Sequence, residues 1–253
     1  MNELTRDDPS PFIVENAGAR SPFLLIGDHA GVAVPATLGD LGLPPEEMAR
    51  HIACDIGIAD MGGILARALG ASFIRQTYSR LVIDCNRAPG WDDSIPPISD
   101  GTMVPANQSL SPADAEGRRA LIFQPYHDAI TAALDQRLQA SLPTVLISLH
   151  SFTPVMRGFV RPWTYGVLHE GRSPFSNAVL AELRGRLGEA VIGDNQPYSL
   201  SGETDYSAPF HAIARGLDYL EIEVRQDLIA DADGQAQAAS VLAEVLPAAL
   251  AAL

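Results

Sequence analysis

PTVLISLHSF, at residues 143–152, is the stretch that decides the fold. A second stretch of the same form, PFLLIGDHA, lies at residues 22–30. Short apolar runs of this kind are typical of strands that are buried on both faces of a parallel sheet. The first run ends at His150 and the second at His29, so the sequence predicts two buried strands that each deliver a histidine at the carboxyl end.

Strands and helices are expected to alternate outward from this pair. We expect further strands at 71–77, 80–86, 164–169 and 218–228. We expect helices at 45–69, 112–141, 174–188, 209–215 and 233–253, and long loops at 31–45, 88–111 and 193–209. Such alternation predicts the α/β class, with a mostly parallel mixed sheet flanked by helices. We expect residues 1–253 to form one domain of this kind.

The charged residues limit the range of functions. The chain carries 31 acidic and 17 basic residues, a formal net charge of -14, and all the basic residues are arginine. Without lysine, neither Schiff-base chemistry nor a Walker-type phosphate loop is available. The acidic balance argues against nucleic acid and against anionic membranes as partners, because both need a positive field. A few arginines can still create a local pocket for a small anionic substrate.

The sequence also carries an expectation about location. It has only two cysteines, so no disulfide framework is implied and a reducing compartment suits it. No basic segment followed by an apolar run marks a signal peptide, and no stretch approaches the roughly 20 apolar residues that span a bilayer. We therefore expect a cytoplasmic protein.

The two histidines at the strand ends suggest a metal site. In open α/β sheets, ligands bind beyond the carboxyl ends of the strands. His29 and His150 at that edge would supply a nitrogen pair suited to zinc. The alternative is that each imidazole simply forms a hydrogen bond with a neighbouring loop.

A carboxylate should complete such a site. Asp55 has apolar neighbours and is expected to be buried, which is costly unless it is paired or bound to a metal. It follows His51 by four residues, so both would share one face of the expected helix, and both or only Asp55 could face the metal. An exposed acid or a buried salt bridge is the alternative for Asp55. Asp28 is better suited to orient an imidazole than to bind the ion.

The segment DYLEIEVRQDL, at 218–228, alternates charged and apolar residues. As a strand it would place Glu221, Glu223 and Arg225 on one face. Such a face is either a solvated edge or the wall of an active site. In an active site, Glu223 would act as general base towards a water, and Arg225 would be a candidate for substrate binding.

A third group of polar residues lies in SRLVIDCNR, at 79–87. Arginines with an asparagine suit bidentate recognition of a carboxylate. Arg87 is the better candidate for substrate, and Asp84 is expected to orient an arginine. The alternative is a structural arginine–aspartate pair that closes the sheet edge.

Residues of the 193–209 loop and the short helix after it are further candidates. His211 and Tyr206 could contact substrate, although helix capping or packing explains them equally well. Tyr198 could belong to a lid, but aromatic loop residues more often pack against their neighbours.

With these residues collected, the chain resembles the N-formylglutamate amidohydrolase family. The resemblance covers most of residues 22–229. It rests on DHAG...VP (28–35), H...DIG (51–57), SRLVIDCNR (79–87), ISLHSF (147–152), RPWTYGVL (161–168), DYS...HAIARG (205–216) and IEVRQDLI (222–229). It implies a phosphorylase/hydrolase-like α/β fold, distantly similar to the zinc carboxypeptidases.

The resemblance also implies roles for individual residues. EVRQD is similar to the carboxypeptidase strand that carries the general-base glutamate, here Glu223. Asn86 and Arg87 look like the pair that holds the substrate carboxylate, and His29 and His150 would bind zinc. The carboxypeptidase His-x-x-Glu signature has Val32 at the glutamate position, so Asp55 is our own substitute for the third ligand.

The resulting hypothesis is a zinc amidohydrolase with one zinc, or another divalent ion, per chain. Glu223 would deprotonate the attacking water, Arg80 would stabilise the oxyanion, and Asn86 with Arg87 would hold the α-carboxylate. N-formylglutamate is the default substrate, giving formate and the free amino acid. A metallopeptidase for short peptides and a non-catalytic binder of small carboxylates on the same fold are the alternatives.

Overall fold

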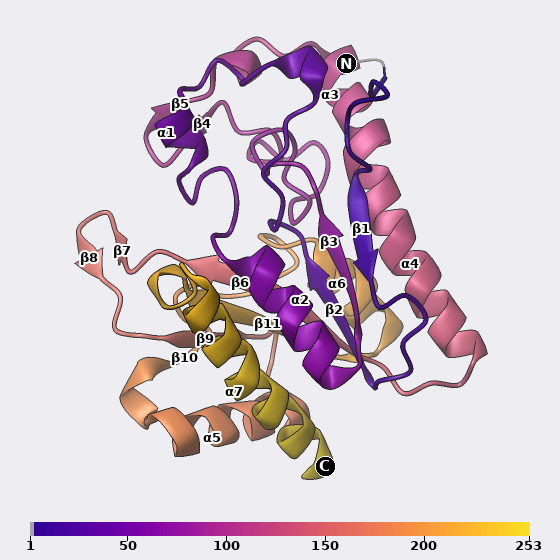
Figure 1. The fold of residues 1–253 in the computed structure, drawn as a ribbon, viewed down its shortest axis with the longest axis vertical. Coiled ribbons are helices and arrows are strands. Elements are labelled where there is room, and N and C mark those ends of the chain that lie inside the picture. The colour runs from indigo at the N-terminus through magenta and orange to yellow at the C-terminus, as the bar shows by residue number, and fades with distance from the viewer. Residues whose placement is uncertain (1–2) are drawn as a thin grey trace.

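The computed structural model describes residues 3–253, and its centre is a seven-stranded mixed sheet in the order β1-β3-β2-β6-β11-β9-β10 (Figure 1). The strands are β1 (Phe12–Glu15), β2 (Phe23–Gly27), β3 (Ser72–Gln76), β6 (Val145–Phe152), β9 (Tyr165–Leu168), β10 (Ile192–Asp194) and β11 (Asp218–Arg225). Neighbours from β3 to β11 are parallel, as are β9 and β10, whereas β1 with β3 and β9 with β11 are antiparallel. The predicted α/β class with a mostly parallel sheet is confirmed.

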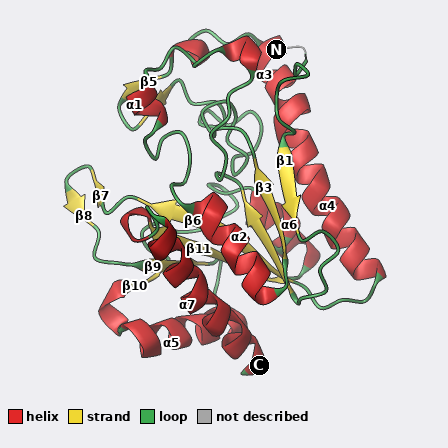
Figure 2. Ribbon diagram, viewed as in Figure 1, coloured by secondary structure: helices red, strands yellow, loops and turns green. Residues whose placement is uncertain are grey.

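Helices cover both faces of the sheet, as Figure 2 shows. The helices are α1 (Pro45–Met48), α2 (Ile58–Leu69), α3 (Pro112–Arg118), α4 (Gln124–Gln139), α5 (Pro174–Leu187), α6 (Ser207–His211) and α7 (Ala232–Ala251). Helices α2, α5 and α7 pack on one face, and α4 and α6 lie on the other. Among the described residues, no helix combines the length and apolarity that crossing a membrane requires.

The alternation of side chains along the central strands separates a core face beneath α2, α5 and α7 from a second face. The second face has its own core beneath α4 and is polar along β11, and we call it the polar face. In β11, Leu220, Ile222 and Val224 are buried in the core beneath α5 and α7. Glu221 and Glu223 therefore point to the opposite face. Strand β11 lies between β6 and β9, so the alternative of a solvated edge strand is wrong.

The helix expected at 45–69 is broken in the structure. Only α1 and α2 are helical, and Asp55 lies in the turns between them, so it shares no helical face with His51. The backbone N–H of Asp55 donates to the carbonyl of His29 at 2.9 Å, which ties these turns to the end of β2. Gly57 then adopts a φ of +84° against Ile229, a close approach that a side chain would block.

The strand expected at 80–86 is also wrong. The segment forms turns, and its backbone bonds to other loops, as when the N–H of Asp84 donates to the carbonyl of Ser94 at 2.8 Å. Leu81 and Val82 are nevertheless fully buried. An apolar run this short predicts burial but does not distinguish a strand from a packed loop.

The remaining elements agree with the prediction more closely. The helix expected at 112–141 appears as α3 and α4, joined by a π-helical turn at Arg119–Phe123, and Ser111 caps it by accepting from the N–H of Asp114. The short edge strands β1 and β10 were not expected. Two small hairpins were also missed: β4 (Ile98–Ser99) with β5 (Thr102–Met103), and β7 (Val155–Met156) with β8 (Phe159–Val160).

Candidate active site

A cavity of about 620 Å³ lies on the polar face of the sheet. Its walls include the end of β6, the middle of β11, and residues of the β4–β5 and β7–β8 hairpins. The candidates from the sequence that line it are His29, His51, Asp55, Arg80, Asn86, Arg87, His150 and Glu223. A cavity of this size suits a small-molecule ligand.

Three of these side chains form a potential metal site. His29, Asp55 and His150 each offer one atom, and these atoms lie within 4.8 Å of one another. Oδ2 of Asp55 is 3.0 Å from Nδ1 of His150 and 3.6 Å from Nδ1 of His29. Two imidazoles and a carboxylate are a donor set that suits zinc and leaves a coordination position open.

His29 is oriented by Asp84 rather than by its neighbour Asp28. Its Nε2 lies 2.7 Å from Oδ1 of Asp84, and its buried Nδ1 has no hydrogen-bond partner among residues 3–253. A carboxylate that accepts from one imidazole nitrogen leaves the lone pair of the other nitrogen free for a metal. The unpartnered Nδ1 is therefore the observation that best fits an ion at this place.

His150 lies inside β6, and its Nε2 faces a group of oxygens. Ser148 Oγ is 3.0 Å away, and carboxylate oxygens of Asp28 and Glu221 are both 3.7 Å away. Burial disfavours an imidazolium, but these carboxylates and Asp55 outweigh it and raise the pKa of His150 well above its ordinary value. Asp28 thus faces an imidazole as expected, although it is that of His150.

Asp55 is held in place from three sides. Its Oδ2 accepts the N–H of Ser151 at 3.1 Å, and its Oδ1 lies 3.4 Å from Nη1 of Arg80. Burial alone would raise the pKa of this carboxyl, but the neighbouring His29 and His150 lower it. Asp55 is therefore an ionised, buried carboxylate, and the alternative of an exposed acid is wrong.

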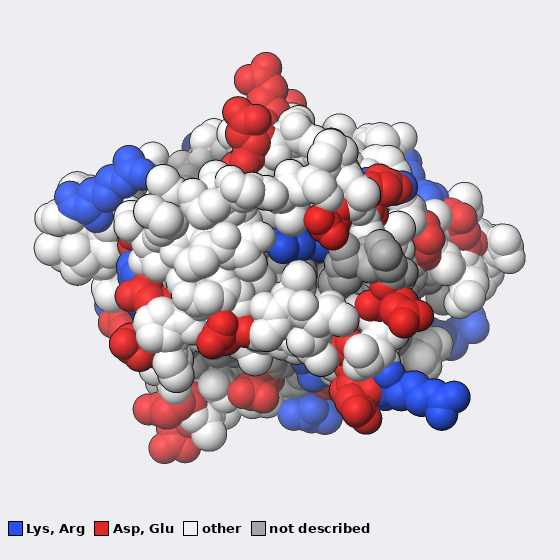
Figure 3. Space-filling model, turned by 90° about the horizontal axis from the view of Figure 1, so that it is seen from above, with Lys and Arg blue, Asp and Glu red and all other residues white. Residues whose placement is uncertain are grey.

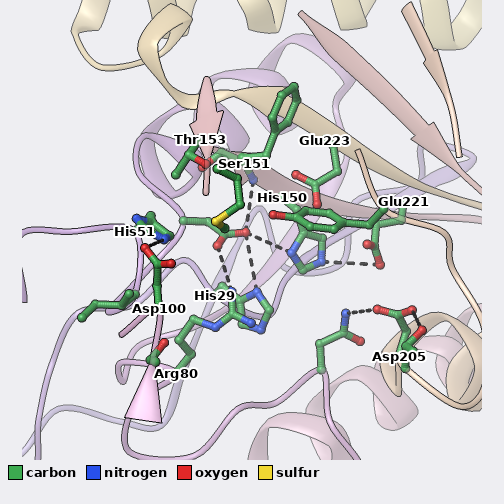
Figure 4. A pocket seen from close by; sticks show the side chains of 18 of the residues that line it. His29, His51, Arg80, Asp100, His150, Ser151, Thr153, Asp205, Glu221 and Glu223 are labelled. Atoms are coloured by element: carbon green, nitrogen blue, oxygen red, sulfur yellow. Dashed lines mark hydrogen bonds and ion pairs between the residues drawn. The ribbon is translucent and has the colours of Figure 1, made fainter. Parts of the chain in front are cut away.

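Glu223 points into the same space as His150, as Figure 4 shows. The two residues are register partners on adjacent strands. Oε2 of Glu223 is buried, and no described residue forms a hydrogen bond with it. Burial raises the pKa of this carboxyl to about 8. A carboxyl with a pKa near neutrality can both accept and release a proton under ordinary conditions.

The arginines from the 79–87 segment are held by acids. Arg80 donates from Nη2 to Asp84 at 2.7 Å, and Arg87 donates from Nε to Asp93 at 2.8 Å. Nη1 of Arg87 is 3.7 Å from Asp205. Asp84 therefore orients an arginine, as expected, in addition to His29.

Asn86 faces both the cavity and the chain that precedes α6. Its Nδ2 donates to Asp205 at 3.2 Å, and its Oδ1 accepts the backbone N–H groups of Tyr206 and Ser207, each at 3.0 Å. These bonds fix the Asn86–Arg87 segment against the 193–209 loop.

Three candidates for substrate contact do not line the cavity. Arg225, the last residue of β11, pairs with Asp227 at 2.8 Å. His211 is fully buried and bonds His127 at 2.8 Å between their rings, and Tyr206 packs on that same histidine. Packing against His127 accounts for His211 and Tyr206, and the ion pair with Asp227 accounts for Arg225.

Several residues that line the cavity were not singled out as site residues. Arg161 and Glu221 are both buried there, and Tyr198, expected only as a possible lid residue, also lines it. Burial raises the pKa of Glu221 to about 8. The alternation of β11 already placed Glu221 beside Glu223, and Arg161 opens the RPWTYGVL segment.

The cavity is lined by four arginines and five acidic residues, so charges of both signs meet there. Figure 3, which looks down on the molecule from above Figure 1, shows acidic side chains spread over this face and a basic group set in a hollow near its middle. A local basic group within an acidic surface can attract an anionic ligand over short distances, because salt screens the more distant charges.

Comparison with known proteins shows which sequences and structures are similar to this chain. Residues 21–230 match the family model described as N-formylglutamate amidohydrolase. An N-formylglutamate deformylase of Pseudomonas putida is 33% identical over 146 residues, which cover 52% of this chain and 52% of that protein. The matched stretch thus spans about half the length of this curated relative.

Two solved structures share the fold over nearly the whole chain. A gene product of Agrobacterium tumefaciens is 32% identical, with a TM-score of 0.94 and 98% of both chains covered. An N-formylglutamate amidohydrolase of Ralstonia eutropha is 20% identical, with a TM-score of 0.69 and coverage of 96% of this chain and 98% of the other.

Proposed function

The chain belongs to the N-formylglutamate amidohydrolase family, and from that premise we propose that it is a metal-dependent amidohydrolase acting on N-formyl amino acids such as N-formylglutamate. The products would be formate and the free amino acid. The observation that carries the proposal is the convergence of His29, Asp55 and His150, whose ligand atoms lie within 4.8 Å of one another. Beside them lies the buried carboxyl of Glu223, whose Oε2 has no hydrogen-bond partner among residues 3–253.

The proposed metal is one zinc ion per chain, held by Nδ1 of His29, Nδ1 of His150 and a carboxylate oxygen of Asp55. The buried Nδ1 of His29, which makes no hydrogen bond to the described part of the chain, supports this assignment. When bound, zinc would supply Lewis acidity, which lowers the pKa of a water and polarises a carbonyl. Another divalent ion with a similar preference for nitrogen ligands would fit the same donors.

The residues of the chain would divide the remaining work. Glu223 accepts a proton from the attacking water, whose oxygen bonds to the formyl carbon, and delivers that proton to the departing amine as the C–N bond breaks. Arg80, held by Asp84 at 2.7 Å, would donate to the developing oxyanion. Asn86 and Arg87 would hold the α-carboxylate of the substrate.

The first experiment is metal analysis together with a formate-release assay on a panel of N-formyl amino acids. We expect about one zinc per chain, with zinc lost in His29→Ala and in His150→Ala. Glu223→Gln should retain zinc and lose about 10²–10⁴-fold in turnover. Glu182→Gln, at a partly exposed ion pair with Arg186, is the matched control and should behave as wild type.

The outcomes separate this proposal from its alternatives. Near-normal turnover in Glu223→Gln, or a metal-free protein that still turns over, would refute the mechanism. A metal-free protein that only binds acylamino acids would indicate a carboxylate binder, and cleavage of short peptides without formate release would indicate a metallopeptidase. We also propose that residues 1–253 form a single domain and that the protein is cytoplasmic. The two free cysteines, Cys54 and Cys85, are suited to a reducing compartment.

A further inference from the structure

Arg161 is a buried cation that lines the cavity. It follows β8 directly and is 6% exposed. Its Nη1 donates to the carbonyl and to the hydroxyl of Thr153, both at 3.2 Å, and its Nη2 donates to the hydroxyl of Tyr198 at 3.1 Å. All of these acceptors are neutral. In the part of the chain that the structure describes, no carboxylate oxygen lies within 4.0 Å of this guanidinium.

The other arginines of the cavity differ from Arg161. Arg80 and Arg87 each pair with a carboxylate of the chain, and the proposed function already assigns them to the oxyanion and to the α-carboxylate. Arg157 lines the cavity as well, but its side chain is exposed and water screens its charge. Arg118 is buried among neutral acceptors too, yet it does not line the cavity. Arg161 therefore combines burial, access to the cavity and a charge without an ion-pair partner among the described residues, with Glu223 as an acid that its charge reaches through space. A buried charge without a close counter-ion is costly.

The surroundings of Arg161 prepare it for a planar anion. Its guanidinium lies 4.9 Å from the ring centre of Tyr198 and 5.7 Å from that of Phe152. These contacts hold the guanidinium in one orientation. Among residues 3–253, its Nε has no hydrogen-bond acceptor, so one edge of the guanidinium is available for a carboxylate. The hydroxyl of Tyr198 accepts from Arg161, which leaves its own proton free to donate to the same anion.

We propose that Arg161, supported by Tyr198, binds the side-chain carboxylate of the substrate and so selects N-acyl amino acids that carry two carboxylates. The inference rests on the proposed function, in which Asn86 and Arg87 hold the α-carboxylate. Phe152 and Met156 line the same cavity, so apolar surface is present for the methylene groups that join the two ends.

The test compares two substrates of nearly equal shape, N-formylglutamate and N-formylglutamine. Wild type should prefer the glutamate compound in kcat/KM. Arg161→Gln should lower kcat/KM for N-formylglutamate about 100-fold and change the glutamine compound little, so that the preference is lost. The control is Arg215→Gln, which removes an arginine from a partly exposed ion pair with Asp135 and should keep the preference.

A second variant guards against misfolding of the first. Tyr198→Phe keeps the aromatic contact with Arg161 but removes the hydroxyl, and we expect about a fivefold loss for N-formylglutamate alone. Equal losses on both substrates in a folded Arg161→Gln would overturn the proposal, since Arg161 would then act on the α-carboxylate or on the fold. An unchanged preference would overturn it as well.

A binding measurement separates this inference from the activity. Calorimetry with glutarate and pentanoate compares a dicarboxylate with a monocarboxylate of the same length, without any turnover. Tighter binding of glutarate by wild type, lost in Arg161→Gln, supports the inference even if neither formyl substrate is hydrolysed, a result that would overturn only the proposed function. Equal affinity of wild type for both acids would overturn the inference and leave the proposed hydrolysis intact.

Discussion

Asp84→Asn is the substitution that most directly tests how the candidate metal site is organised. Oδ1 of Asp84 lies 2.7 Å from Nε2 of His29, and Oδ2 lies 2.7 Å from Nη2 of Arg80. A carboxylate can accept from both groups at once, whereas an amide can accept on only one side. In the variant we expect the amide oxygen to stay with the charged Arg80, because hydrogen bonds to ions are the stronger ones.

The amide NH₂ would then face Nε2 of His29. That nitrogen would have to act as an acceptor, which shifts the imidazole proton to Nδ1 and removes the lone pair that the metal needs. Loss of such an orienting partner typically costs 10–100-fold in metal affinity, or about 1.4–2.7 kcal/mol. We expect this weakening of zinc binding, together with a comparable loss of formate release at limiting zinc.

The assay is competition for zinc between the protein and a chromogenic chelator, with thermal unfolding as a check on folding. Asp135→Asn is the matched control, because Asp135 pairs with Arg215 away from the cavity at 2.7 Å. A folded Asp84→Asn protein with wild-type zinc affinity would refute the reasoning, since Asp84 would then not set the protonation of His29.

Three further predictions concern stability. Burial lowers the pKa of His127 from 6.5 to about 4. The contribution of this neutral imidazole to the free energy of unfolding is therefore fully present above pH 6.5, and up to roughly 3 kcal/mol of it is lost as the pH falls towards 4. Urea unfolding at pH 7 and at pH 5 measures this loss of stability, and the loss should be smaller in His127→Gln than in wild type. An equal loss in the variant would contradict the prediction. Gly31→Ala should cost at least about 2 kcal/mol, because an added Cβ would lie 2.1 Å from the carbonyl carbon of Thr77; an unchanged Tm would show that the backbone yields easily. Ser111→Ala should remove the N-cap of α3 and lower the free energy of unfolding by about 1 kcal/mol, which corresponds to a few degrees in Tm. An unchanged Tm would mean that Pro112 alone is sufficient to start the helix.

Local patterns along the chain were sufficient to predict the α/β class and the main strands. The apolar runs that end near His29 and His150 form β2 and β6, which are adjacent in the sheet. The period of two in β11 placed Glu223 on the polar face, because successive side chains of a strand point to opposite sides. These features depend on neighbours within a few residues, so the amino-acid order alone determined them.

Only the tertiary structure decided how the site is completed. Asp55 reaches the histidines from turns and not from a helix, because its backbone is tied to His29 and Gly57 turns the chain against Ile229. Asp84 orients His29 from a packed loop that looked like a strand. Arg161 stands out because no carboxylate of the described residues forms an ion pair with it, whereas Arg225 pairs with Asp227. Which charges meet and which remain unpaired depends on contacts between segments far apart in the sequence, and periodicity within one segment carries no record of those contacts.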